Sequence, residues 1–323
     1  MGKTLGLAFL IILPLVPSVR AGAEPSEPLF KENPYSWMVQ GVMEFPFYSF
    51  YVGAPAIHGH AYLPNFAPRL GPRVSYEDLG FIITFGLPQP RQEKQRRGDS
   101  TYKNVVLSSY WRQNAMDLYF QDFKGFYASS PFTELSFAKP ARYPQLPDAH
   151  ILNAGFNWYY VVNPTRYSLR AAFDQTEFQL RSGGSWVYHP FFNHLEIYLG
   201  NAFVPGSNPN ALSAIPNLAA GRFDTLGLGA GYGYTYIRSY LFACIQGVLG
   251  PALQLQKLQR TEGGFTERVS YAGKLNVNFS AGWNYDRDVY GAKVLIDSLW
   301  ARVENTEMYS SLVGIQIFYG RRF

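Results

Sequence analysis

The sequence predicts an all-β protein, a closed antiparallel transmembrane β-barrel of about 12 strands, with 10 to 14 compatible with its pattern. Three observations predict this class: an export signal, long segments of strict alternation, and a C-terminal aromatic residue. The composition agrees, because 17% of the residues are aromatic and only 16% are charged, against roughly 25% in a typical soluble domain.

The N-terminus has the features of a cleaved signal peptide. A basic residue precedes an apolar run from Leu5 to Val16, and a small-residue cleavage site ends at Ala23. The run is shorter than the roughly 20 residues of a membrane-spanning helix. We expect residues 1–23 to be removed, residues 24–35 to form a short periplasmic segment, and residues 36–323 to form the barrel.

The stretch FDTLGLGAGYGYTYI, from Phe223 to Ile237, alternates strictly. One face carries apolar and aromatic side chains, and the other carries four glycines. These glycines do not form a dinucleotide-binding motif, because that motif needs a third glycine three residues after the second, and position 232 is Tyr. We expect the bare face to make room for inward side chains from neighbouring strands or to open a channel.

The stretch YAGKLNVNFSAGWNY gives the best example of a membrane-spanning strand. Aromatic residues, Tyr271 at one end and Trp283 at the other, bracket an aliphatic centre on one face. Lys274, Asn276 and Asn278 lie on the opposite face and are predicted to line a lumen. Strands of soluble sheets are mostly five or six residues long, so a secreted or periplasmic β-sandwich is the weaker alternative.

Thirteen segments show strand patterns, whereas a bacterial barrel normally has an even number. Counting back from Phe323, the short turns of the C-terminal half fall on the periplasmic side and the longer loop falls outside, as expected. Further back, the long segments fall on the periplasmic side instead. This inversion places a misjudged strand between residues 129 and 222 and leaves 12 strands. The segments are 39–51, 69–77, 80–85, 104–111, 116–127, 151–162, 166–180, 185–199, 223–237, 240–255, 271–285, 289–303 and 308–323.

The last segment alternates up to Phe323, and a terminal aromatic residue on such a strand is typical of proteins recognised by the barrel-insertion machinery. Arg321 departs from the apolar residue usual two positions before the end. We therefore expect this machinery to be a partner, together with outer-membrane lipid and lipopolysaccharide.

At MDLYFQDFKGFY, at GFNWYYVVNPTRYSLRAAFDQTEFQLRSGGSW and at GLGAGYGYTYI, the chain resembles a family of bacterial outer-membrane barrels catalogued as a domain of unknown function. The most specific part runs from Tyr167 to Ser185, although Leu180 and Gly183 depart from the family's usual residues. The resemblance implies a barrel and an outer-membrane location, and it implies no activity.

Within this run the apolar face changes parity near Asp174, which predicts a β-bulge in a strand. Charged side chains on the lipid face cost about 2 to 4 kcal/mol each at mid-bilayer for Arg, so the polar ones are predicted to point inward. They form either a selectivity surface or a network that fills the barrel. The predicted lumen-lining residues here are Arg166, Arg170, Gln175, Glu177, Gln179 and Arg181.

Catalytic and metal-binding signals are weak. A lipid hydrolase of phospholipase or lipid A deacylase type would need a nucleophile beside a base, and the candidates Ser185 and His189 are about 13 Å apart on one strand, with His194 nearby. The sequence His58-Gly59-His60 lacks neighbouring metal ligands, so we predict no catalytic or metal residues and no cofactor.

Charge excludes one class of partner. Removing residues 1–23 leaves 26 basic and 23 acidic residues, a net charge of about +3, which does not indicate nucleic acid. The basic run RQEKQRRGD is expected to be a solvated loop, or a contact with lipopolysaccharide phosphates if the loop is extracellular. The sequence favours a non-enzymatic barrel, either a narrow pore for small polar solutes or a structural or surface-interaction barrel. The oligomeric state stays open.

Overall fold

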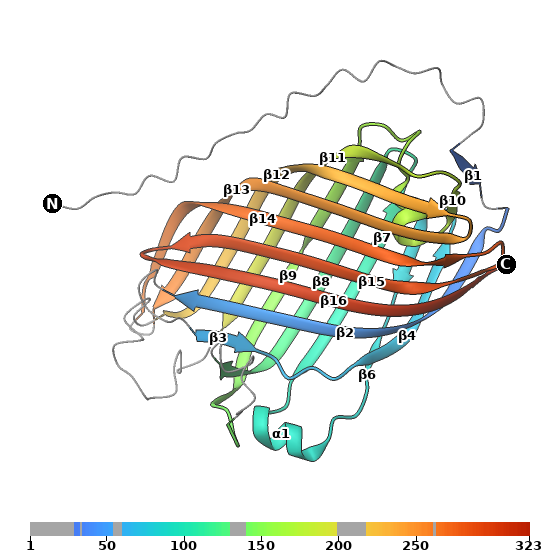
Figure 1. The fold of residues 1–323 in the computed structure, drawn as a ribbon. Coiled ribbons are helices and arrows are strands. Elements are labelled where there is room, and N and C mark those ends of the chain that lie inside the picture. The colour runs from blue at the N-terminus through green and yellow to red at the C-terminus, as the bar shows by residue number, and fades with distance from the viewer. Residues whose placement is uncertain (1–28, 33, 54–59, 130–139, 199–217, 261–262) are drawn as a thin grey trace.

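The computed structural model describes residues 29–32, 34–53, 60–129, 140–198, 218–260 and 263–323. Twelve antiparallel strands form a ring, which confirms the predicted fold class and strand number (Figure 1). Around the ring they are β2 (Trp37–Gly53), β16 (Thr306–Arg322), β15 (Asp288–Val303), β14 (Phe265–Asn284), β13 (Leu241–Arg260), β12 (Leu218–Arg238), β11 (Gly183–Tyr198), β9 (Gln145–Val161), β8 (Asn114–Ser129), β7 (Thr101–Tyr110), β5 (Leu79–Ile82) and β4 (Arg69–Tyr76).

Pairing of β2 with β4 closes the ring. Closure satisfies the main-chain groups that an open edge would leave unpaired in lipid. Near one end of the barrel a short strand, β3 (His60–Leu63), pairs with both β2 and β8 in place of the shorter β4, β5 and β7. The remaining elements are β1 (Phe30–Glu32), β6 (Phe85–Gly86), α1 (Arg91–Arg97), the π-helical turn η1 (Arg170–Asp174) and β10 (Glu177–Gln179).

The two ends of the barrel differ. At the end that we call the C-terminal end, Phe323 pairs with Trp37 and adjacent strands are joined by short turns, such as Ser239–Tyr240. The opposite end, the loop end, has the long connections, including residues 199–217 between β11 and β12. Bacterial barrels have short turns on the periplasmic side and longer loops outside, so the C-terminal end is periplasmic.

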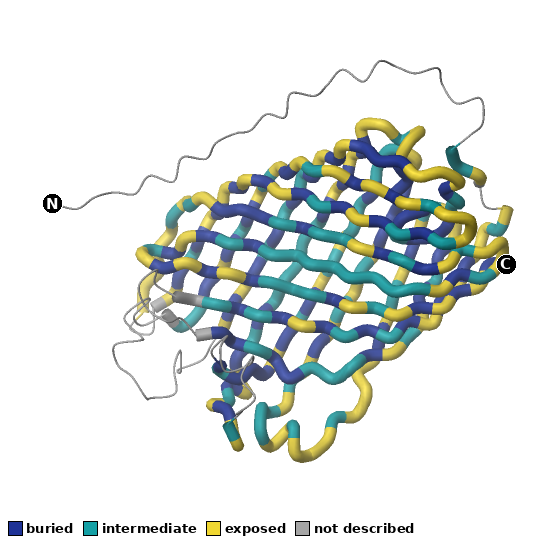
Figure 2. The backbone as a smooth tube through the Cα atoms, viewed as in Figure 1, coloured by how far each residue is buried: buried dark blue, intermediate teal, exposed yellow. Residues whose placement is uncertain are grey.

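Buried and exposed residues alternate along the wall strands, as the bands in Figure 2 show, because successive side chains of a strand lie on opposite faces. Large apolar residues such as Leu226 and Ile245 are more than half exposed on the outer face, where lipid covers them. Outward aromatic residues, including Trp186, Tyr234 and Trp283, lie towards the C-terminal end. The protein is therefore an integral outer-membrane barrel. Within the described residues no helix is long and apolar enough to cross a membrane.

The predicted strand 166–180 and its bulge near Asp174 are wrong. After β9 the chain leaves the wall, forms η1 and β10 inside the C-terminal end, and returns to the wall at Gly183. Alternation misled the prediction because this segment packs against protein on more than one side, so its polar and apolar faces do not distinguish lipid from lumen. The error lies within the predicted interval 129–222.

The N-terminal predictions fall partly outside the described residues. Residues 1–23 lie there entirely. In the segment 24–35, Phe30–Glu32 form β1, which pairs antiparallel with β10 and not with the wall.

Candidate functional site

The interior of the barrel has three layers. At the C-terminal end lies the plug, which we define as residues 167–179 and which contains η1 and β10. Towards the loop end lies an apolar layer. Between them are two adjoining polar cavities, which we call the chamber, because Phe173 of the plug lines one cavity and Tyr48 and Leu299 of the apolar layer line the other.

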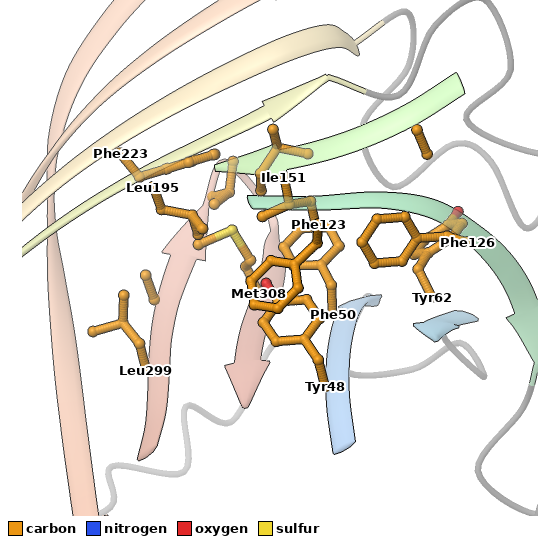
Figure 3. Packing of buried hydrophobic residues seen from close by; sticks show 14 of the residues in the cluster. Tyr48, Phe50, Tyr62, Phe123, Phe126, Ile151, Leu195, Phe223, Leu299 and Met308 are labelled. Atoms are coloured by element: carbon orange, nitrogen blue, oxygen red, sulfur yellow. The ribbon is translucent and has the colours of Figure 1, made fainter. Parts of the chain in front are cut away.

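The apolar layer joins strands from all round the barrel (Figure 3). Its centre is an aromatic stack, with ring centroids 4.4 Å apart for Tyr48 and Phe123 and 5.0 Å apart for Tyr102 and Phe123. Phe50, Tyr62, Phe126, Phe191, Phe223 and several aliphatic residues surround it. These buried side chains lie between the chamber and the loop end and narrow the lumen there.

Wall side chains hold the plug by its main-chain carbonyls. Ser280 Oγ donates to Ala172 O (2.5 Å), Lys293 Nζ donates to Phe173 O, and Arg322 Nη2 donates to Gln175 O (2.6 Å). Arg322 also lies over the Phe178 ring, 4.6 Å from its centroid. The penultimate residue of the chain therefore connects the last wall strand to the plug.

Two plug side chains anchor it further. Asp174 accepts hydrogen bonds from Arg73 Nη2 (2.5 Å) and Ser75 Oγ (3.2 Å), and its carboxyl group is fully buried. The Tyr167 hydroxyl donates to Gln246 Oε1 at 3.2 Å. The Tyr167 ring occupies space left by Gly233, since a Cβ at that glycine would lie 2.4 Å from the ring. Here the bare face of β12 makes room for an inward side chain.

Several buried polar atoms of the plug have no hydrogen-bond partner in the protein. Asp174 Oδ2, Gln175 Oε1 and Thr176 Oγ1, in consecutive residues, are buried without a hydrogen-bond partner in the protein. Each such atom costs about 1–3 kcal/mol. Gln175 also has a φ of 57°, in the left-handed region that non-glycine residues seldom adopt. These features reduce the free-energy cost of moving the plug into water.

The chamber consists of cavities of about 80 and 150 Å³. Lys274, fully buried, lines the first: its Nζ donates to Asn157 Oδ1 (2.9 Å) and pairs with Asp297 Oδ2 (3.1 Å). It also lies over the rings of Tyr119 and Phe191. Both cavities are lined by Val106, Asp117, Gln121, Leu295 and Leu312.

Charge in the chamber is balanced. Three acidic residues and three basic residues line the two cavities: Glu44, Asp117, Asp297, Arg73, Lys274 and Lys293. Their opposite charges compensate one another where water is scarce, which is the condition for retaining ions in an interior. Amide and hydroxyl side chains make up most of the remaining polar lining.

The predicted lumen residues divide into three groups. Lys274 and Asn276 line the first cavity and Asn278 the second. Gln175, Glu177 and Gln179 belong to the plug, and Arg170 pairs with Asp78 at 3.0 Å. Arg166 and Arg181 are exposed at the C-terminal end and do not line the chamber, because the segment that carries them is not a wall strand.

Of the six charged residues that line the chamber, sequence reasoning identified Lys274 and missed Glu44, Arg73, Asp117, Lys293 and Asp297. The parity of their strands holds a usable signal: Lys293 and Asp297 share the inward face of β15 with Leu295 and Leu299. A charged residue at an inward position of a spanning strand needs a partner across the lumen. The identity of that partner depends on tertiary structure.

Ser185, His189 and His194 do not converge on one site. Ser185 Oγ accepts from Asn163 N (2.7 Å) and donates to Trp186 O (3.0 Å). His189 is buried inside, stacked on Tyr159 with ring centroids 4.7 Å apart. His194 lies on the outer face, with Nδ1 2.5 Å from Asp224 Oδ1.

In the sequence His58-Gly59-His60, for which we predict no metal site, His58 and Gly59 lie outside the described residues. Among the described residues no cluster of three or more His, Cys, Asp or Glu side chains is arranged to hold a metal. The basic run RQEKQRRGD, expected to be a loop, forms α1 at the loop end.

The family model described as "Domain of unknown function (DUF4421)" matches residues 31–323. No curated protein matches the sequence. Among solved structures, the chain aligns with outer membrane protease OmpT from Escherichia coli at 7% identity, covering 91% of this chain and 99% of that one, with a TM-score of 0.36. It aligns with Ail, the attachment invasion locus protein of Yersinia pestis, at 8% identity (89% and 99% covered, TM-score 0.27). For the Pseudomonas putida toluene transporter TodX, identity is 9% (90% and 91% covered, TM-score 0.26).

Proposed function

This chain belongs to the DUF4421 family, whose description assigns no activity, and we propose that it is a plugged outer-membrane conduit for small polar solutes. In the proposed resting state the plug closes the periplasmic side of the chamber and the apolar layer narrows the outer side. Solute passes when the plug moves.

The observation that carries this proposal is the polar chamber enclosed between the plug and the apolar layer. A barrel that needed only mechanical stability would gain most from a satisfied interior, because unpaired buried polar atoms cost free energy. Here consecutive plug residues have such atoms, while the chamber keeps two cavities. Both features favour a segment that exchanges between bound and released positions.

The lining supports a preference for uncharged polar solutes. Acidic and basic residues are equal in number, so the chamber attracts neither anions nor cations strongly. Amide groups such as those of Asn157 and Asn276 offer both donors and acceptors.

The proposal includes no catalytic step. A hydrolase would require a nucleophile within hydrogen-bond reach of a base, and Ser185, His189 and His194 have separate contacts. A purely structural barrel is the alternative that the test below must separate.

The test is single-channel conductance in planar bilayers. One variant replaces residues 170–176 of the plug with seven glycine and serine residues. A matched control makes the same replacement in α1, residues 91–97, at the other end of the barrel. Heat-dependent mobility on a gel establishes that each protein is a folded barrel.

We expect the wild type and the α1 control to show rare openings, and the plug variant to conduct for most of the recording. A folded plug variant that is as silent as the wild type would mean that the interior is structural filling, and the conduit proposal would fail.

A further inference from the structure

A basic surface at the loop end is independent of the chamber and the plug. It covers α1 and the adjoining ends of β7, β8 and β9, and we call it the basic rim. Its basic members are Arg91, Lys94, Arg96, Arg97, Lys103, Lys124 and Arg142, and its acidic members are Glu93, Asp99, Asp122 and Asp148. Seven basic residues against four acidic ones give it a formal charge of +3.

Hydrogen bonds fix α1 against this part of the rim. Tyr143 N donates to Arg96 O (2.9 Å), and Gln145 Nε2 donates to Gln95 O (2.9 Å) just before β9. Asn65 Nδ2 donates to Gly98 O (2.8 Å) at the end of the helix. The cations of α1 are therefore held beside those of the strands.

The strands show where the rim lies relative to the membrane. Val105 and Phe120 face each other across β7 and β8, and both are exposed on the outer, lipid-facing side. The next outward pair towards the loop end is Lys103 with Asp122. Lys124 follows on the same face of β8 and pairs in register with His150 of β9. The change from apolar to charged residues marks the headgroup level, since charged side chains are costly within hydrocarbon.

Lys103 and Lys124 are available to a ligand. The Lys103 side chain is 77% exposed, and its contact with Asp122 is 3.5 Å long. Lys124 and Arg142 are also exposed. Cations at this height on the extracellular side meet the headgroups of the outer leaflet, where phosphate is the strong acceptor for ammonium and guanidinium groups.

We propose that the basic rim binds the phosphates of an outer-leaflet glycolipid of the lipid A type. Lys103 and Lys124 contact the phosphates from the lipid-facing side, and Arg142 and the α1 cations contact them from above. This surface does not require that the barrel conduct.

The opposite wall provides a matched control. At the same level of β12, β13 and β14 the cations Arg222 and Lys257 pair with Asp224 at 3.0 Å and with Glu267 at 2.7 Å. Glu196 adds a further acidic residue, so the described charges at this level are not predominantly basic.

The test measures binding of fluorescent bisphosphorylated lipid A to the full-length protein in phosphatidylcholine nanodiscs. The rim variant is K103Q/K124Q/R142Q. The control with the same charge change is R222Q/K257Q/R302Q, in which Arg302 is exposed at the loop end of β15. Both are checked for folding by heat-dependent gel mobility. Dephosphorylated lipid A and inorganic phosphate serve as probes of the wild type.

We expect affinity for lipid A to fall about 100-fold in the rim variant, because each of its three cations contributes roughly a fivefold factor near anionic lipid, and to change less than about twofold in the control. Binding by the wild type should weaken with salt and with removal of the phosphates. Equal losses in the two variants, or unchanged binding of dephosphorylated lipid A, would overturn the proposal. If inorganic phosphate competed for the rim at the same concentration as lipid A, the ligand would be free phosphate and not a lipid headgroup.

Discussion

The guanidinium group of Arg73 in β4 lies 2.5 Å from the carboxylate of Asp174 in the plug, and this contact joins the wall to the segment inside it. The two residues are 101 positions apart in the chain. Asp174 is fully buried and Arg73 nearly so, and the second carboxylate oxygen of Asp174 has no partner. This ion pair between plug and wall is therefore made by a single carboxylate oxygen of Asp174.

Replacing Asp174 with asparagine should release the plug more easily. The change keeps the shape and leaves the Arg73 charge buried without its anion, which costs about 3 kcal/mol. We expect more frequent channel openings and a lower urea midpoint, read from heat-dependent gel mobility. Asp99→Asn, in the exposed pair with Lys94, should cost less than about 1 kcal/mol. Indistinguishable midpoints for these two variants would contradict the role of this ion pair.

A methyl group at Gly233 should displace Tyr167. Its Cβ would lie 2.4 Å from the Tyr167 ring, whereas a Cβ at Gly247, on the outer face of β13, meets no atom within 4 Å. We expect Gly233→Ala to cost about 1–3 kcal/mol and to increase conductance. Gly247→Ala is the matched control, and both are measured by urea unfolding and in bilayers. Equal behaviour of the two alanine variants would show that Tyr167 moves aside without affecting the plug.

The N-terminal strand should help to retain the plug. Leu180 N donates to Leu29 O (2.8 Å), so alternation along the antiparallel pair places Lys31 and Phe178 in the next hydrogen-bonded pair. Lys31→Pro removes the main-chain donor. We expect more openings than in Lys31→Ala, which keeps the donor, in bilayer recordings. If the proline and alanine variants conduct alike, β1 does not restrain the plug.

Removing the buried amine at Lys274 should destabilise the barrel through Asp297. Lys274→Met keeps the length of the side chain and leaves the Asp297 carboxylate without its ion partner, at a cost of about 3 kcal/mol. Adding Asp297→Asn should recover part of that loss, and a double-mutant cycle by urea unfolding measures the coupling. Additive effects of the two substitutions would mean that the pair contributes no coupling energy.

The terminal residue should matter for assembly more than for stability. Phe323 is 64% exposed, and its main chain exchanges hydrogen bonds with Trp37. Phe323→Ala keeps these bonds, so we expect the refolded protein to be stable within about 0.5 kcal/mol of the wild type. The fraction of assembled, heat-modifiable barrel in cells should fall if the insertion machinery reads this side chain. An unchanged assembled fraction would argue against recognition through Phe323.

Some of the fold follows from local pattern. The outward residues of β14, from Tyr271 to Trp283, and the inward Lys274, Asn276 and Asn278 have the predicted parity, because a strand places successive side chains on opposite faces whatever its neighbours are. Parity and loop length also located the surplus strand. The predicted bulge at Asp174 failed because the same alternation fits a segment surrounded by protein.

By itself, the sequence determined the barrel class, the strand number and the inward face of strands such as β12 and β14, since these depend on period and length along the chain. Tertiary structure alone decided that residues 167–179 enter the lumen and that Arg73 meets Asp174 and Lys274 meets Asp297. Those contacts depend on closure of the ring and on the stagger between strands, which bring together side chains that no local spacing relates.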